Sequence, residues 1–234
     1  MTDAERRGRL LQFAAGAAFL ALAVVLVLIV INASSGGDGG DTKLEGAAPV
    51  NQLLAGLPQK GMTLGDPKAP VELVEFGDLQ CPVCAAYSEE ILPSIIENQV
   101  NNGQVRIDFR NFTIISQESV PAGAAALAAG KQGRGWNFVE LFYRNQGSEA
   151  SGYADDDAFL ESVARGAGVK NLAKWNAERA KLTPEVEKTT EEARSLGFDG
   201  TPSFAVKGPG AGGLEPIGTP RSLEDLEAAL EAAE

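Results

Sequence analysis

The sequence predicts an α/β domain in which a block of helices separates an early β-α-β unit from a closing β-β-α unit, with one transmembrane helix before the domain. Three observations support this prediction. Residues 10–31 are almost wholly apolar. Short segments with the apolar pattern of strands lie at residues 71–76, 105–112, 203–206 and 214–217. Between residues 119 and 196 the pattern is that of successive helices, and nothing there resembles a strand.

The composition excludes several classes of protein and of site. The chain has 234 residues and carries 20 Lys and Arg against 32 Asp and Glu, a net charge of −12. Such an acidic surface repels phosphate backbones, which argues against nucleic-acid binding. The chain has no histidine, which excludes Ser-His-Asp and Cys-His catalysis and histidine metal ligands. With two cysteines in all, Cys81 and Cys84, a fold held together by several disulfides is excluded as well.

Residues 10–31 form the predicted transmembrane anchor, because an apolar helix of about 20 residues crosses a hydrocarbon core of about 30 Å. Three arginines lie within residues 1–9, whereas no basic residue follows the apolar run until Lys43. The positive-inside rule therefore predicts a cytoplasmic N-terminus at residues 1–9 and places everything after the anchor outside. A cleaved signal peptide is the alternative, although its apolar region would be shorter. We expect a single-pass protein of the plasma membrane with an extracytoplasmic domain.

The chain after the anchor divides into a linker and one domain. Residues 32–60 are the predicted extracytoplasmic linker, because their first part is rich in Gly, Ser and Asp and therefore flexible. Within it, residues 50–57 are expected to form a short helix against the domain. Residues 61–234 are long enough to bury one core.

Periodicity predicts the first elements of the domain. Residues 71–76 form a strand, and a helix runs from Pro82 to about residue 99. Residues 105–112 alternate apolar and polar side chains, which is typical of a strand with one buried face. These three elements give the β-α-β unit.

A helical insertion is predicted at about residues 116–197. Its helices are expected at residues 122–129, 136–144, 155–166 and 184–196. Residues 203–206 and 214–217 form two closing strands around a Gly-rich turn. Ser222 begins a capping box, which predicts a final amphipathic helix.

Cys81 and Cys84 form a CxxC pair at the junction between the first strand and the first helix. A zinc site needs four nitrogen or sulfur ligands, which this chain lacks, and a structural disulfide across so short a loop stabilises little. A redox-active dithiol is therefore favoured. The helix N-terminus favours the thiolate of Cys81, the predicted attacking sulfur. Cys84 lies one turn further on, where it can resolve a mixed disulfide, and Pro82 suits the first helical turn.

Several stretches resemble the DsbA-like branch of the thioredoxin superfamily. The first is Val74-Glu-Phe-Gly-Asp-Leu-Gln-Cys-Pro-Val-Cys84, and the second is Thr201-Pro-Ser-Phe204. Residues 130–138 are similar to the helical region of that family, and the resemblance spans about residues 66–230. From periodicity alone, Pro202 has even odds of being an ordinary residue at the start of a strand.

This resemblance implies a thioredoxin-like fold with a helical insertion and a protein thiol:disulfide oxidoreductase of the membrane-anchored bacterial type. It also implies that Pro202 follows a cis peptide bond and packs beside the dithiol. The Thr201 backbone would then be free to pair with an extended substrate chain. The catalytic residues implied are Cys81, Cys84, Glu75 and Pro202, and the substrate-binding residues are Thr201, Pro202, Pro82 and Val83.

Glu75 lies six positions before Cys81, where thioredoxin-like proteins carry a buried acid beneath the resolving cysteine. The strand pattern alone favours a carboxylate that faces water, like Glu72, and the positional match reverses that preference. A carboxyl group in apolar surroundings has a raised pKa and can take up the proton of Cys84.

Val83 is the departure from the best-known family pattern. The strongly oxidising members carry CPHC, whereas this chain has no histidine anywhere. We therefore expect the pKa of Cys81 to be roughly 5–6.5, between about 7 for thioredoxin and about 3.5 for DsbA.

The leading functional hypothesis is an oxidase of exported proteins that have free cysteines. Its Cys81–Cys84 disulfide would be transferred through a Cys81 mixed disulfide that Cys84 resolves. By family resemblance, a DsbB-like or vitamin K epoxide reductase-like membrane protein would re-oxidise the dithiol. A disulfide isomerase or reductase with the same site, and a non-catalytic peptide-binding or chaperone module, are the alternatives. No nucleotide-binding motif is present, so no cofactor is expected.

Overall fold

The computed structural model of the chain describes residues 44–147 and 151–234. The predicted cytoplasmic N-terminus (residues 1–9) and anchor (residues 10–31) lie outside the described residues. In the part that the structure does describe, no helix is long and apolar enough to cross a membrane.

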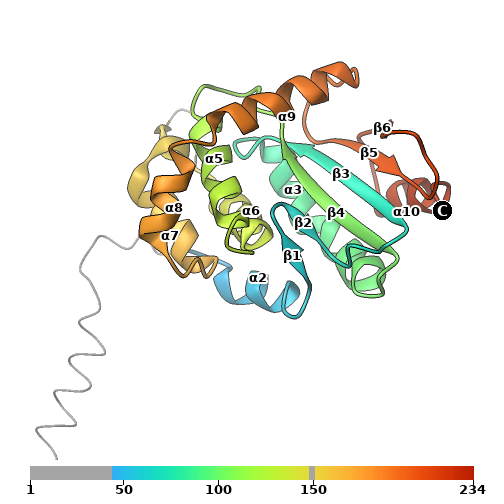
Figure 1. Cartoon of the computed structure of the whole chain (residues 1–234), viewed down its shortest axis with the longest axis horizontal. Helices are drawn as coiled ribbons and strands as arrows, with labels where there is room; N and C mark the ends of the chain where they lie inside the picture. The colour runs from blue at the N-terminus through green and yellow to red at the C-terminus, as the bar shows by residue number, and fades with distance from the viewer. Residues whose placement is uncertain (1–43, 148–150) are drawn as a thin grey trace, which may run out of the picture. The chain divides into compact units, whose positions relative to one another are not determined.

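Six strands form one mixed sheet in the order β1-β2-β4-β3-β5-β6 (Figure 1). The strands are β1 (Gln59–Lys60), β2 (Thr63–Leu64), β3 (Val71–Gly77), β4 (Val105–Asn111), β5 (Ser203–Lys207) and β6 (Glu215–Gly218). The central strand β3 pairs in parallel with β4 and antiparallel with β5. The four predicted strands are confirmed. The hairpin of β1 and β2 was not predicted, because strands of two residues are too short to show a period.

The helix predicted from Pro82 to residue 99 is broken into three pieces. The structure has α3 (Pro82–Glu90), α4 (Leu92–Ile95) and a π-helical turn, η1 (Ile96–Val100). Pro93 explains the break after α3, because proline has no N–H to donate and its ring clashes with the preceding turn. The single-helix prediction was therefore wrong in its continuity, while the start of the helix at the CxxC pair is confirmed.

Helices fill the chain between β4 and β5, which confirms the predicted insertion. They are α5 (Ser119–Gly130), α6 (Gly135–Tyr143), η3 (Tyr153–Asp155), α7 (Asp157–Gly166), α8 (Leu172–Arg179) and α9 (Thr183–Ser195). Figure 1 shows α5 to α8 gathered beside the sheet, with α9 crossing back toward β5. Every residue of α6 is buried. Within it, the indole N–H of Trp136 donates to the Met62 carbonyl at 2.6 Å, which fixes α6 to the β1–β2 hairpin.

Residues 44–60, assigned above to the linker, lie against the folded domain. They form α2 (Ala47–Leu53) and then β1, which agrees with the expected short helix. Val50 and Leu54 are buried in the core, and the amide of Asn51 donates to the Gly166 carbonyl at 3.2 Å. The folded domain thus begins before residue 61.

The final helix, α10 (Leu223–Glu231), begins where the capping box predicts. The Ser222 hydroxyl accepts a hydrogen bond from the Asp225 N–H at 3.1 Å. Leu226 and Leu230 are buried, and α10 packs against α4.

The alternation of side chains along β3 decides which residues lie under the dithiol. Val74 and Phe76 belong to a small core on the face of the sheet that α9 covers. Val71 and Leu73 point the other way and belong to the main core, which includes both cysteines. Glu75 shares the parity of Val71 and Leu73, so its carboxyl group enters the main core on the α3 face.

Candidate functional site

The two cysteines lie where the chain passes from β3 into α3. Cys81 is the N-cap residue of α3, and its sulfur accepts a hydrogen bond from the Cys84 N–H at 3.4 Å. Pro82 occupies the first turn, where its missing N–H costs nothing. The Cys81 thiol donates to the Thr201 carbonyl at 3.3 Å, and both cysteines are free thiols.

The two thiols differ sharply in acidity. The pKa of Cys81 is lowered to about 6, chiefly by its hydrogen bond with the Cys84 side chain; Thr201 and backbone N–H groups add to this, against the effect of burial. The pKa of Cys84 is raised well above its ordinary value, first by burial and then by the hydrogen bond and charge of Cys81. At neutral pH, Cys81 is therefore the thiolate and Cys84 keeps its proton. An attacking and a resolving cysteine need this asymmetry.

The residues between the cysteines form the exposed part of the motif. The side chain of Cys84 has no exposed surface, and Cys81 is 4% exposed. Pro82 is exposed and Val83 is 56% exposed. A partner that approaches the dithiol therefore meets Pro82 and Val83 first.

The predicted loop at Thr201 and Pro202 lies beside the dithiol, and the peptide bond between these residues is cis. Pro202 is buried and Thr201 is half-buried. The Thr201 carbonyl oxygen accepts a hydrogen bond from Cys81 while Cys81 is a protonated thiol. A Cys81 thiolate or disulfide has no proton to donate, so this oxygen can then pair with a substrate chain.

Glu75 is fully buried, and neither carboxyl oxygen has a hydrogen-bond partner among the described residues. Its pKa is raised well above the ordinary value by burial, by the charge of Glu140 and by that of Cys81. The structure therefore contradicts the water-facing alternative and places a buried acid beside the dithiol. The charge of Glu75 in turn raises the pKa of Cys84.

Asp78 and Gln80 organise the loop before Cys81, and neither is among the site residues predicted from the sequence. The Asp78 carboxylate accepts from the Gln80 N–H at 2.9 Å and from the N–H groups of Ile114 and Ile115 at 2.8 and 2.9 Å. The Gln80 side chain accepts from the hydroxyl of Ser119 at 2.8 Å. In the sequence, the signal for this role is that Asp78 and Gln80 are polar residues in the short loop directly before the CxxC motif.

We expect Asp78→Ala to lower the free energy of unfolding of the reduced protein by about 3 kcal/mol, because three backbone N–H groups lose their acceptor. Asp78→Asn is the matched control: it keeps one acceptor oxygen and should lose less. Urea unfolding followed by circular dichroism measures both. A loss below about 1 kcal/mol for Asp78→Ala would contradict this role.

Three large apolar side chains are exposed among the described residues: Val83, Ile114 and Ile115. The isoleucines are each 37% exposed. Asp78 holds their backbone against the loop that leads to Cys81. The loop at residues 113–116 thus presents apolar side chains beside the CxxC loop, where apolar side chains of an unfolded chain could dock.

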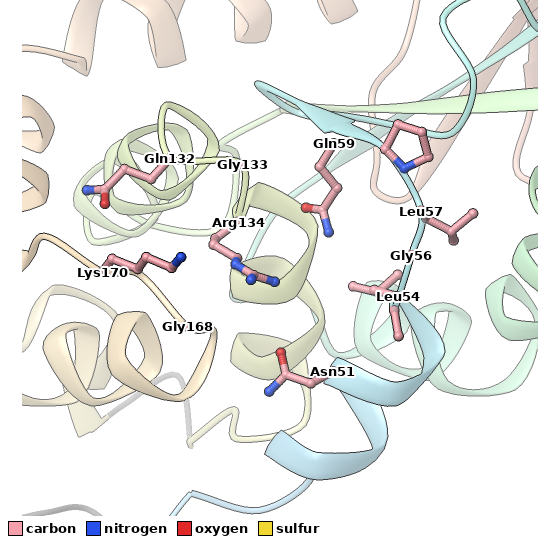
Figure 2. A pocket seen from close by; sticks show the side chains of 12 residues that line it. Asn51, Leu54, Gly56, Leu57, Gln59, Gln132, Gly133, Arg134, Gly168 and Lys170 are labelled. Carbon is pink, nitrogen blue, oxygen red and sulfur yellow. The ribbon is translucent and has the colours of Figure 1, made fainter.

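A pocket of about 810 Å³ lies apart from the dithiol, between α2, the chain leading to β1 and the loops at residues 132–134 and 168–170. Figure 2 shows Arg134 and Lys170 extending into it, with Asn51 on the opposite wall. None of the predicted site residues lines this pocket. In the described ranges, no group of three or more His, Cys, Asp or Glu side chains could hold a metal ion.

The dithiol lies at the junction of β3 and α3, beside a cis proline. A family model that matches the chain agrees with this arrangement. Residues 58–232 match the model described as Thioredoxin. The chain belongs to the thioredoxin family. The resemblance to its DsbA-like branch is confirmed by the relatives described next, and the chain is a protein thiol:disulfide oxidoreductase of this type.

The curated relatives of this thioredoxin-family chain include proteins named for disulfide bond formation. A probable disulfide bond formation protein D of Bacillus cereus is 31% identical over 193 residues, covering 79% of this chain and 84% of the relative. Disulfide bond formation protein D of Bacillus subtilis is 26% identical and covers 67% and 72%.

Among solved structures, oxidised BdbD of Bacillus subtilis has a TM-score of 0.62 at 21% identity, covering 76% of this chain and 97% of that one. The α-DsbA1 protein of Wolbachia pipientis has a TM-score of 0.64 at 22% identity, with 79% and 95% covered. At these identities the similarity establishes the fold. It extends to the helical insertion, because almost the whole of each solved chain is covered.

Proposed function

We propose that this oxidoreductase works as an oxidase on the outer face of the plasma membrane and forms disulfide bonds in exported proteins. The observation that carries the proposal is the acidity difference within the dithiol: the pKa of Cys81 is lowered to about 6 and that of Cys84 is raised. A stabilised Cys81 thiolate favours the reduced enzyme, which makes the disulfide form an oxidant. The names of the Bacillus relatives support the same direction.

The proposed reaction starts from the Cys81–Cys84 disulfide. A substrate thiolate attacks the Cys81 sulfur; the bond between the two cysteines breaks, and Cys84 leaves as a thiolate that takes up a proton. A second substrate thiolate then attacks the substrate sulfur of the mixed disulfide and releases the Cys81 thiolate. The substrate loses two electrons and gains a disulfide, and the enzyme gains the two electrons.

Re-oxidation runs through the same intermediate. The Cys81 thiolate attacks a disulfide of the re-oxidising partner and forms a mixed disulfide. Cys84 then gives up its proton, attacks the Cys81 sulfur and restores the Cys81–Cys84 disulfide, and the partner leaves as a dithiol. We propose that the re-oxidising partner is a DsbB-like or vitamin K epoxide reductase-like membrane protein. Residues 10–31 would hold the enzyme close to it.

Two measurements on the full chain test the direction. Equilibration with glutathione gives the reduction potential, which we expect between about −270 mV for thioredoxin and about −120 mV for DsbA. The oxidised chain should also restore activity to a reduced, unfolded ribonuclease as its own dithiol appears. A potential at or below the thioredoxin value, with no ribonuclease recovery, would favour a reductase.

Val83→His should lower the pKa of Cys81 and raise the reduction potential. An imidazole at an exposed position of the first turn can donate to the thiolate or carry a positive charge, which valine cannot. Each pKa unit corresponds to about 1.36 kcal/mol, and hence to a rise of at most about 30 mV in the potential.

Thiolate absorbance during a pH titration and glutathione equilibration measure these two effects. Val83→Thr serves as the control, since it changes polarity without adding a titratable group. An unchanged potential in the histidine variant would show that the side chain at position 83 does not tune the dithiol.

A further inference from the structure

A second buried carboxyl group, Glu140, lies in the middle of α6 and has no place in the chemistry described so far. Its side chain has no exposed surface. The hydroxyl of Ser88 donates to one carboxyl oxygen at 2.9 Å, and the other oxygen has no hydrogen-bond partner among the described residues. A buried carboxyl group with a single hydrogen bond is costly for stability, so its presence calls for a functional explanation.

The fold places Glu140 against the part of α3 that follows the dithiol. Ser88 follows Cys84 by one turn of α3, so both residues face α6, which packs against α3. Tyr143, one turn beyond Glu140, donates its hydroxyl to the Asp78 carbonyl at 3.4 Å, at the end of β3. Glu75 enters the same main-core region from β3. Glu75 of β3 and Glu140 of α6 are thus both fully buried, and both lie on the face of the sheet that α3 covers.

The charge of Glu140 acts on Glu75. The pKa of Glu140 is raised to about 7 by burial, which outweighs the Ser88 hydrogen bond and the charge of Arg144, and Glu89 raises it further. The charge of Glu140 is the largest contribution after burial to the raised pKa of Glu75. A negative charge on one buried carboxyl group disfavours ionisation of another one nearby.

Glu89 and Glu90 of α3, which packs against α6, are exposed, and the charge of Glu89 contributes less to the pKa of Glu140 than burial, Ser88 and Arg144 do. Tyr87 of α3 and Tyr143 of α6 interact with Glu75, and burial raises the pKa of both phenols, so they are neutral at pH 7. The helices α2 and α5 have no ionisable side chain, and Lys60 of β1 is exposed. The ion pairs of α7 are Arg165 with Glu161 and Asp157 with Arg179 of α8, and none of these carboxylates is buried.

We propose that Glu140 is a positioning residue for the Cys84 step, in which its charge decides whether Glu75 is free to take the proton of Cys84. When Glu140 holds a proton, a single negative charge on Glu75 is tolerated in the main core. When Glu140 is ionised, repulsion keeps Glu75 protonated, and Cys84 has no base. The inference rests on the proposed exchange chemistry and adds to it the residue that governs its pH dependence.

Proton and electrons in this step are exchanged among Glu75, Cys84, Cys81 and the partner's sulfur. Glu75 as a carboxylate accepts the proton of the Cys84 thiol; the Cys84 thiolate attacks the Cys81 sulfur of the mixed disulfide, and the partner's sulfur leaves as a thiolate. At the end of the step Glu75 holds the proton that Cys84 has lost, and the negative charge has moved to the partner's thiolate. The hydrogen bond from Ser88 stabilises the carboxylate of Glu140 and so sets the pH at which Glu140 ionises.

The test is the pH dependence of the Cys84 step in the full chain, measured by rapid mixing after a Cys81 mixed disulfide has been formed with a small aromatic thiol. Glu140→Gln removes the repelling charge. We expect the midpoint of the pH–rate profile to fall by about one pH unit or more. Ser88→Ala should shift it in the same direction by a smaller amount, because Glu140 then stays protonated to higher pH. Glu187→Gln, which removes an exposed carboxylate on α9, should leave the midpoint unchanged.

A second readout separates this inference from the proposed function. Carbon-13 NMR of labelled glutamate carboxyl groups follows the Glu75 titration directly, whether or not the chain oxidises substrates. A Glu75 midpoint that is the same in the parent chain, Glu140→Gln and Ser88→Ala would overturn the inference while leaving the oxidase proposal intact. In a Glu75→Gln background, adding Glu140→Gln should no longer move the pH–rate midpoint; a further shift there would show that Glu140 does not act through Glu75. If Glu140→Gln fails to fold, Ser88→Ala alone decides the question.

Discussion

Cys84→Ala should accumulate covalent complexes with exported proteins, whereas Cys81→Ala should trap almost none. In the first variant the Cys81 thiolate still attacks disulfides of exported proteins and displaces one of their sulfurs as a thiolate, and no second enzyme thiol is present to break the resulting mixed disulfide. In the second variant the remaining thiol is buried, and burial, the largest cause of its raised pKa, does not depend on the Cys81 side chain, so Cys84 stays protonated at neutral pH. Non-reducing gels of cells expressing each variant, with reduction as the control lane, measure the difference.

We expect the difference in trapped protein to be at least about 100-fold, since the lower thiolate fraction and the burial of Cys84 act together. Cys81→Ala/Cys84→Ala is the background control for non-covalent association. Equal trapping by the two single variants would contradict the assignment of attacking and resolving sulfurs. It would also remove the main support for a mixed disulfide on Cys81.

Glu75→Gln should slow the Cys84 step by about 100-fold at pH 7, the lower end of what a general base contributes. Glutamine has the same shape but cannot accept the Cys84 proton. The sign of the pH dependence follows from the raised pKa of Cys84: without a base, the step waits for direct ionisation of the thiol, so the deficit should narrow as the pH rises toward that pKa. Stopped-flow measurement of mixed-disulfide decay between pH 6 and 9 records the profile.

Glu72→Gln is the matched control for Glu75→Gln. Glu72 lies on the same strand but is only half-buried, and its carboxylate pairs with Arg106 at 2.6 Å rather than facing the dithiol. Its rate profile should match that of the parent chain. Identical profiles for both glutamine variants would assign Glu75 a purely structural role.

The residues that carry chemistry could be predicted where the signal is local. Cys81, Pro82 and Cys84 follow a recognisable strand and begin a helix, so their surroundings are fixed by a few consecutive residues. The start of α10 at Ser222 is local in the same sense. The pattern alone left Pro202 at even odds and favoured a water-facing Glu75, and only the family resemblance turned both toward a functional role, because that role depends on proximity to a distant segment.

Other features could not be predicted because their partners are far away in the chain. Asp78 binds N–H groups of Ile114 and Ile115, and nothing near Asp78 in the sequence indicates those partners. Glu140 looks like one polar residue in an apolar helix, and only packing on α3 reveals that Ser88 faces it. The break after α3 was a different failure: Pro93 was visible, but the apolar spacing on either side outweighed it.

The exposed position of Val83 has a consequence for how such enzymes diverge. Backbone N–H groups and the Cys84 thiol stabilise the Cys81 charge, while the side chain of residue 83 is 56% exposed. Substitutions at exposed positions usually change stability by no more than about 0.5 kcal/mol, whereas changes that alter activity often reduce stability. A lineage could therefore acquire a stronger or a weaker oxidant through a single codon, with selection acting on redox balance and hardly at all on folding.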